Sequence, residues 1–214
     1  MRLLNCVISY NRYYYLRNTL ESLSSFFPFG DTIVIDNDSS DPILLQYLEE
    51  LEASSRCRIV RNRRERGEPG TFDPGRPGFW EAVEYGIRQA VSGEYDYVQL
   101  IEDDVQFMWY DPTHMDKIHQ IFTARSDCLW LSSLFVDRLD PAAEATLELI
   151  DDPQCYRSRT YSQHSTGFLS VKRVKETGYR FVDSNEAEKK WAGLGFRAYV
   201  MATPVLAWVP WESA

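Results

Sequence analysis

The chain has 214 residues, of which 44% are hydrophobic and 26% are charged. This composition excludes a disordered or fibrous protein and is typical of an ordinary globular domain. The 23 basic and 32 acidic residues give a formal net charge of −9. Binding to nucleic acid or to an anionic membrane through bulk charge is therefore not expected. No apolar run approaches the roughly 20 residues that span a bilayer.

Apolar runs alternate with helical stripes along the first half of the chain. The runs at 3–8, 32–35, 59–60 and 97–101 predict strands. Between them, apolar residues at helical spacing predict helices around Leu16, Leu20 and Leu23, around Leu44, Leu48 and Leu51, and around Trp80, Val83, Ile87 and Ala90. This β-α-β order predicts an α/β fold with a mostly parallel central sheet and helices on its faces.

The second half of the chain is less regular. Met115, Ile118 and Phe122 predict a helix, residues 128–131 and 166–171 predict strands, 184–194 a helix, and 199–208 an extended segment. The polar residues 137–163 are interpreted as an insertion. We expect one domain over 1–214, with a nucleotide-binding half at 1–104 and a metal and acceptor half at 105–214.

Three adjacent carboxylates follow the apolar strand at 97–101. They belong to Glu102, Asp103 and Asp104, and they repel one another unless a positive group lies beside them. A hard divalent cation, held by one or two carboxylates together with phosphate oxygens, is a natural partner. A solvated acidic turn is the alternative. Because ligands of parallel sheets gather at the carboxyl ends of strands, this position favours the metal.

Polar side chains also follow the first two predicted strands. Ser9 to Arg12 come after the first strand, and Asp36 to Ser39 come after the second. Such side chains can line a pocket for a nucleoside. They also favour Asx turns and helix caps, and the pattern leaves both interpretations open.

Six arginines lie between Arg56 and Arg66, and the glycine- and proline-rich stretch 61–78 predicts a long loop. A run of charge is usually a solvated surface. The alternative is that some of these arginines neutralise a diphosphate or an anionic acceptor, in a loop that closes as a lid.

Several common enzyme classes lack their motifs here. The chain has no Gly-Lys-Ser/Thr phosphate loop and no Gly-x-Gly-x-x-Gly after the first strand. His114, His119 and His164 form no metal-binding cluster, and the four cysteines have no metal-binding spacing. Reduced cysteines, together with an N-terminus unlike a secretion signal, predict a cytoplasmic protein.

Taken in order, these motifs resemble nucleotide-sugar glycosyltransferases of the GT-A fold, most closely family 2. The resemblance starts at residues 7–12 and continues through 33–41. It includes Glu102-Asp103-Asp104 in place of the family's DXD metal motif. Residues 165–173 with Gly178 resemble the donor-sugar segment, and 185–188 with 195–197 resemble the acceptor helix.

The resemblance implies transfer of a sugar from a nucleoside diphosphate sugar, with UDP favoured, to a carbohydrate or other hydroxyl acceptor. The transfer would be inverting and would use Mn²⁺ or Mg²⁺. Asp104 and Glu102 would hold the metal, with Asp103 as an alternative ligand. The implied nucleotide contacts are Ser9, Tyr10, Asn11, Asp36, Asn37 and Asp103. Donor or phosphate contacts would come from Arg61, Arg66 and Gly167.

The family also implies a catalytic carboxylate at the start of the helix at 184–194. Glu186 is the closest match, followed by Glu188 and Asp183. In a capping box Glu186 would merely bond the backbone near Asp183. Ala187, Trp191 and Leu194 are predicted to form the core-facing stripe of this helix.

Two other functions remain open on this sequence. One is a catalytically silent protein that binds a nucleotide sugar, and the other, less favoured, is a nucleotidyltransferase. The second usually needs a glycine-rich loop after the first strand, which Ser9 to Arg12 do not provide. If the glycosyltransferase uses a lipid-linked acceptor, that acceptor would bring it to a membrane surface without a transmembrane segment.

Overall fold

A computed structural model describes residues 1–62, 77–134, 147–148, 150–151, 154–158, 166–178 and 190–209. The strands of the first half are β1 (Leu3–Ser9), β2 (Asp31–Asp36), β3 (Arg58–Arg61) and β4 (Tyr97–Glu102). They alternate with α1 (Tyr13–Phe26), α2 (Pro42–Ala53) and α3 (Pro77–Ser92). The predicted β-α-β order is confirmed.

The second half contributes β5 (Val105–Phe107), β6 (Cys128–Ser132), β7 (Leu147–Glu148), β8 (Cys155–Ser158), β9 (Gly167–Ser170), β10 (Arg197–Met201) and β11 (Leu206–Trp208). Within the described part of this half, helices are α4 (His114–Ala124) and α7 (Val171–Thr177), and residues 190–193 are also helical. The segment predicted as an insertion at 137–163 contains β7 and β8, which pair with each other at the end of the main sheet. No helix within the described ranges is both long and apolar enough to cross a membrane.

The main sheet has nine strands in the order β3-β2-β1-β4-β9-β6-β10-β8-β7. The first four are parallel, and β9 runs antiparallel between β4 and β6. A small second sheet pairs β5 with β11. This arrangement confirms the predicted mostly parallel α/β sheet and adds two reversed strands, β9 at its centre and β8 near one end.

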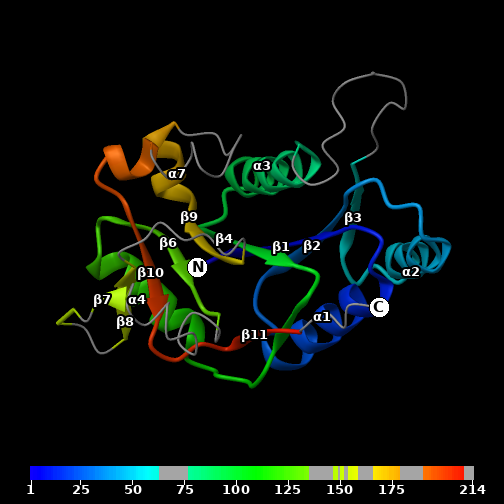
Figure 1. Ribbon diagram of the computed structural model, residues 1–214, viewed down its shortest axis with the longest axis horizontal. Helices are drawn as coiled ribbons and strands as arrows, with labels where there is room; N and C mark the ends of the chain where they lie inside the picture. Colours follow the sequence, from blue (N-terminus) through cyan, green and yellow to red (C-terminus); the bar gives the residue numbers. More distant parts are fainter. Residues whose placement is uncertain are drawn as a thin grey trace.

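Two apolar layers cover the sheet (Figure 1). One contains α1, α2 and α4, whose leucines and isoleucines pack with Leu3 and Val7 of β1. The other contains α3 and α7, which pack with Leu4, Cys6 and Ile8. Successive strand residues face opposite sides, so β1 supplies both layers and is buried over its whole length.

Two predictions for the second half are wrong in detail. The predicted strand at 166–171 ends at Ser170, because Val171 and Val174 begin α7 and turn their side chains into the core. Leu194 is 59% exposed, although Trp191 is fully buried as expected. The helix at 190–193 ends before Leu194, and the chain turns at Gly195, where φ is +87°. Leu194 therefore leaves the stripe before it can reach the core.

Candidate active site

The ends of three parallel strands meet at one edge of the sheet. Ser9 of β1 pairs in register with Asp36 of β2, and Ile8 pairs with Glu102 of β4. The sheet therefore brings Ser9, Asp36 and Glu102 together, as the sequence predicts for strand ends. We call this the carboxyl edge of the sheet.

Asp103 connects β4 to β1. Its Oδ2 accepts a hydrogen bond from Ser9 Oγ at 2.7 Å and one from the Tyr10 backbone N–H at 3.3 Å. The residue is only 4% exposed. Burial raises the pKa of this carboxyl to about 6, although the Ser9 hydroxyl and the Arg12 guanidinium oppose the rise. These contacts show that Asp103 holds the Ser9–Tyr10 backbone against the acidic loop.

Arg12 supplies positive charge to this acidic loop. Its Nη1 lies 3.2 Å from Asp103 Oδ1 and 3.0 Å from Asp104 Oδ2. The sequence singled out Arg12 only as one of four polar residues after β1. The sequence did contain an indication of its role, because three adjacent carboxylates need a positive group beside them. Nη1 carries two N–H groups, so it can donate to one oxygen of each side chain.

Thr19 of α1 fixes the same acidic loop from the helix side. Its hydroxyl lies 2.8 Å from the Asp103 carbonyl oxygen and 2.6 Å from the Val105 carbonyl oxygen. Thr19 is fully buried in α1. The acidic turn is therefore bonded both to the end of β1 and to the middle of α1.

Asn11 organises the loop that follows β2. It lies in the left-handed region at φ +53°, which Asn tolerates better than most residues. Its Oδ1 accepts from the backbone N–H groups of Ser40 at 2.7 Å and Asp41 at 2.9 Å. Its own N–H donates to Ser39 Oγ. Asn11 thus has a structural function here, as the cap and turn interpretation allowed.

Asp36 lies at the end of β2, beside Ser9 at the carboxyl edge. It is 2% exposed, and its Oδ1 accepts from the Ser39 N–H at 3.2 Å, which fixes the turn after β2. Asp41, not this turn, caps α2 by accepting from Ile43 N–H. Tyr10 differs from these residues because it is 49% exposed beside the edge.

Two further residues border the edge on the β3 side. Asn37 donates its backbone N–H to the Ser9 carbonyl oxygen, and its Oδ1 accepts from Asn62 Nδ2 at 3.1 Å. Arg61 is the last residue of β3 and is partly exposed. Its position allows the phosphate contact that the sequence predicts, and that contact remains a prediction.

Gly167 begins β9, next to the acidic loop. A Cβ on Gly167 would lie 2.6 Å from the Trp130 ring, so packing alone requires glycine here. The neighbouring Thr166 hydroxyl accepts from the Glu102 backbone N–H at 3.1 Å. The predicted donor-sugar segment therefore lies beside Glu102.

Four predicted site residues lie outside the described residues. They are Arg66, Asp183, Glu186 and Glu188. The same is true of residues 63–76, which form most of the predicted lid.

The oxygen donors at this edge suit a hard divalent cation. Glu102 and Asp104 are partly exposed carboxylates on the same turn, whereas both oxygens of Asp103 bond within the protein. Among the described residues, no three His, Cys, Asp or Glu side chains form a ready-made metal cage. Mn²⁺ and Mg²⁺ bound with phosphates need only one or two carboxylates, so the residues fit such an ion.

Comparison with solved structures identifies the class of this fold. The chain matches TarS from S. aureus with a TM-score of 0.63 at 15% identity, covering 98% of this chain and 37% of TarS. It matches the mannosyltransferase PcManGT from Pyrobaculum calidifontis, in complex with GDP-Man and Mn²⁺, with a TM-score of 0.64 at 16% identity. That match covers 99% of this chain and 58% of PcManGT. At such identities the likeness defines the fold, which is the GT-A glycosyltransferase fold.

A third structure agrees. GalNAc-T7, with UDP, GalNAc and Mn²⁺, matches with a TM-score of 0.66 at 12% identity, covering 100% of this chain and 44% of GalNAc-T7. The chain thus spans between 37% and 58% of the length of these three solved structures. No curated protein matches the sequence.

A match in sequence supports the same class. Residues 6–110 match the family model of Glycosyl transferase family 2. The matched segment includes β1, β2, β4 and the acidic loop. This half of the chain is therefore similar to Glycosyl transferase family 2.

Proposed function

We propose that this protein transfers a sugar from a nucleoside diphosphate sugar, with UDP favoured, to a hydroxyl acceptor with inversion. The observation that carries the proposal is the carboxyl edge, where Asp36, Glu102 and Asp104 surround the ends of three parallel strands. Solved structures of the same fold hold GDP-Man or UDP together with Mn²⁺, which supports a donor of this chemistry.

The residues of the edge have distinct proposed roles toward the nucleotide. The exposed ring of Tyr10 packs on the base, since aromatic faces stack well on flat heterocycles. Asp36 accepts from a base N–H or a ribose hydroxyl, and Asn37 lies beside it. Asp103 acts indirectly, because its bonds fix the backbone that carries Tyr10.

Asp104 and Glu102 would hold Mn²⁺ or Mg²⁺ against the diphosphate. When bound, the ion offsets the negative charge that develops on the departing nucleoside diphosphate. Arg61 and Arg66 contribute further positive charge toward the phosphates. Glu186, with Glu188 and then Asp183 as alternatives, accepts the proton of the acceptor hydroxyl.

One contact favours a second candidate function. Arg12 already supplies a cation to Asp104, at 3.0 Å. A protein that uses this pair instead of a metal could bind a nucleotide sugar without turning it over. The two candidates differ in metal dependence and in turnover.

Calorimetry with UDP, in Mn²⁺ and in EDTA, tests the metal role. We expect the wild-type protein to bind UDP at least about tenfold more weakly in EDTA than in Mn²⁺. Asp104→Asn in Mn²⁺ should be weakened by a similar factor. Asp116→Asn is the control, because Asp116 is an exposed carboxylate in the first turn of α4. Arg12→Gln separates the role of the metal ion from that of the Arg12 guanidinium, since it keeps the Asp104 oxygens and removes the ion pair. Equal UDP affinity in EDTA and Mn²⁺ would contradict the metal role.

Donor turnover tests the enzyme assignment. Hydrolysis of UDP-, GDP- and TDP-sugars is measured by release of the nucleoside diphosphate, with and without Mn²⁺. Binding without any turnover, across these donors and simple sugar acceptors, would support the silent binding protein.

Glu186→Gln tests the base. The amide keeps much of the capping geometry but cannot accept the proton, so turnover should fall by roughly 10²–10⁴-fold with donor affinity unchanged. Normal turnover in this variant together with loss in Glu188→Gln would transfer the role to Glu188.

A further inference from the structure

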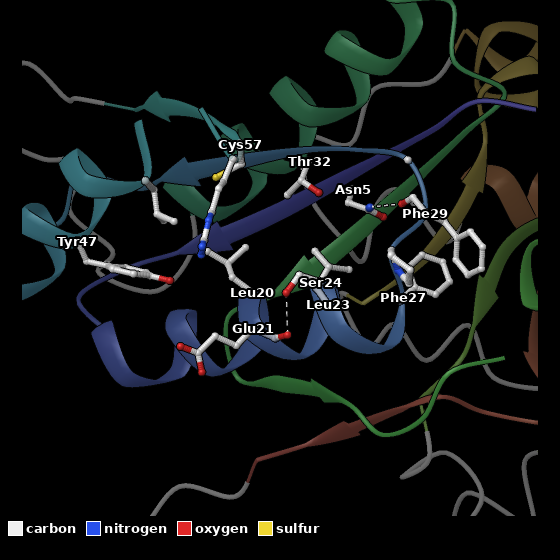
Figure 2. A pocket seen from close by; sticks show the side chains of 14 residues that line it. Asn5, Leu20, Glu21, Leu23, Ser24, Phe27, Phe29, Thr32, Tyr47 and Cys57 are labelled. Atoms are coloured by element: carbon white, nitrogen blue, oxygen red, sulfur yellow. Dashed lines mark hydrogen bonds between the residues drawn. The ribbon is translucent and has the colours of Figure 1, made fainter. Parts of the chain in front are cut away.

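A cavity of about 500 Å³ lies between α1, α2 and the sheet, away from the carboxyl edge. Figure 2 shows Tyr47 at one end and the aromatic pair Phe27 and Phe29 at the other. Asn5 lies in β1, four residues or about 13 Å before Ser9. Cavities of this size accept small organic ligands.

The cavity has a polar floor. Asn5 is 1% exposed, and its Nδ2 donates to the Phe29 carbonyl oxygen at 2.7 Å. Its Oδ1 is buried and has no hydrogen-bond partner within the described part of the chain. A buried carbonyl oxygen without a donor costs about 1–3 kcal/mol, so it favours a ligand that donates to it.

The walls of the cavity are apolar and already in place. Leu23, Phe27 and Leu51 are buried, while Leu20 and Phe29 are partly exposed to the cavity. The turn from α1 to β2 is fixed at Gly30, where φ is +82° and a Cβ would lie 2.4 Å from the Leu3 carbonyl oxygen. The lining therefore needs no rearrangement to surround an apolar group.

The mouth of the cavity carries positive charge. Arg56 is exposed, and no ion pair or hydrogen bond of its side chain occurs within the described ranges. The one carboxylate of the lining, on Glu21, is already paired with Arg17 at 2.7 Å. The unpaired guanidinium beside the apolar walls favours an anion.

We propose that this cavity binds a small aromatic carboxylate that also carries a hydroxyl group. The hydroxyl donates to Asn5 Oδ1, the ring packs against the leucine and phenylalanine walls, and the carboxylate faces Arg56. The site is separate from the carboxyl edge, and it does not depend on the proposed transferase function.

Cys57 offers a direct readout of occupancy. It lines the cavity and is partly exposed, whereas Cys6, Cys128 and Cys155 are each at most 1% exposed. Alkylation by iodoacetamide, followed by mass spectrometry of the Cys57 peptide, therefore reports on this site. The probes are 4-hydroxyphenylacetate and the longer 3-(4-hydroxyphenyl)propanoate.

We expect at least one saturating probe to slow Cys57 alkylation about fivefold or more. The methoxy analogue, which cannot donate to Asn5, should bind about three- to tenfold more weakly. Arg56→Gln should weaken the carboxylate probe but leave 4-hydroxybenzyl alcohol unaffected. Asn5→Leu should remove the difference between hydroxy and methoxy probes, and Arg56→Gln remains decisive if Asn5→Leu fails to fold.

Three results would overturn the proposal. The first is the absence of protection by either probe, and the second is equal affinity for hydroxy and methoxy analogues. The third is protection of Cys57 by UDP with Mn²⁺, which would make the cavity part of the donor site.

Discussion

At the carboxyl edge of the sheet, polar side chains bond to the backbone and to one another, whereas beneath α1 and α4 several do not. Asn11 and Asp103 each accept two or more hydrogen bonds at the edge. In the interior, both side-chain polar atoms of Gln99 and both ring nitrogens of His114 are buried, with no partner in the described part of the chain. Buried polar side chains thus stabilise the carboxyl edge, where they are hydrogen-bonded, and cost free energy in the interior, where they are not.

The difference arises from backbone geometry. Loops at strand ends present unpaired N–H groups, and the side chains of the edge accept from them. Gln99 lies inside β4, where the backbone bonds of the sheet leave no donor for it. Deleting a polar group should therefore have opposite effects in the two regions.

His114→Leu should show the largest effect. Burial lowers the pKa of His114 to about 4, so the folded chain disfavours the protonated ring. The contribution of His114 to the unfolding free energy of the wild type should fall by about 3 kcal/mol as pH falls from about 6.5 to about 4. The variant should lack this loss, as measured by urea unfolding at each pH.

Asp103 titrates in the opposite sense over an overlapping range. Its raised pKa makes the folded chain the better proton acceptor, so stability rises as pH falls from about 6 toward 3.8. This contribution is common to the wild type and to His114→Leu, so it cancels in their difference. A difference that does not vary with pH would show that His114 is not held neutral.

Asn11→Ala should destabilise the carboxyl edge by about 1–3 kcal/mol. It leaves the N–H groups of Ser40 and Asp41 without their acceptor and places alanine at positive φ. Asn11→Asp is the matched control, since it keeps an acceptor oxygen and tolerates this backbone. Equal stability of the two variants, by thermal or urea unfolding, would show that the loop does not depend on this side chain.

Gln99→Leu should have the smallest effect and the opposite sign. Removing two unbonded polar atoms from the interior should stabilise the fold by about 1 kcal/mol. Gln46→Leu serves as the control, because Gln46 is an exposed residue of α2 and its replacement should change stability by less than about 0.5 kcal/mol. A clear loss of stability in Gln99→Leu would mean that Gln99 has a bonding partner after all.

The sequence predicted the first half of the fold well because its signals are local. Apolar strands such as 97–101 and stripes such as Leu44, Leu48 and Leu51 need only their own spacing to be recognised. The reversal of β9 depends on β4 and β6, which lie far away in the chain, and no local pattern encodes it. The start of α7 at Val171 was hidden because β9 runs into it without a turn residue.

The candidate site was predictable to the same extent. Ser9, Asp36 and Glu102 were located because each follows an apolar run, and the parallel sheet aligns their ends. The ion pairs of Arg12 were not, since they join residues about 90 positions apart in the chain. Asn5 and the cavity depend on packing between two helices, which spacing alone does not reveal.

Helix α1 contacts both the carboxyl edge and the cavity. Its 14 residues form a rod of about 21 Å, preceded by Asn11 and Arg12 at the carboxyl edge. Thr19 bonds its middle to the acidic turn, and Leu20, Glu21, Leu23 and Ser24 in its second half line the cavity. The cavity and the acidic turn are therefore connected through one helix, and any displacement of α1 would involve both.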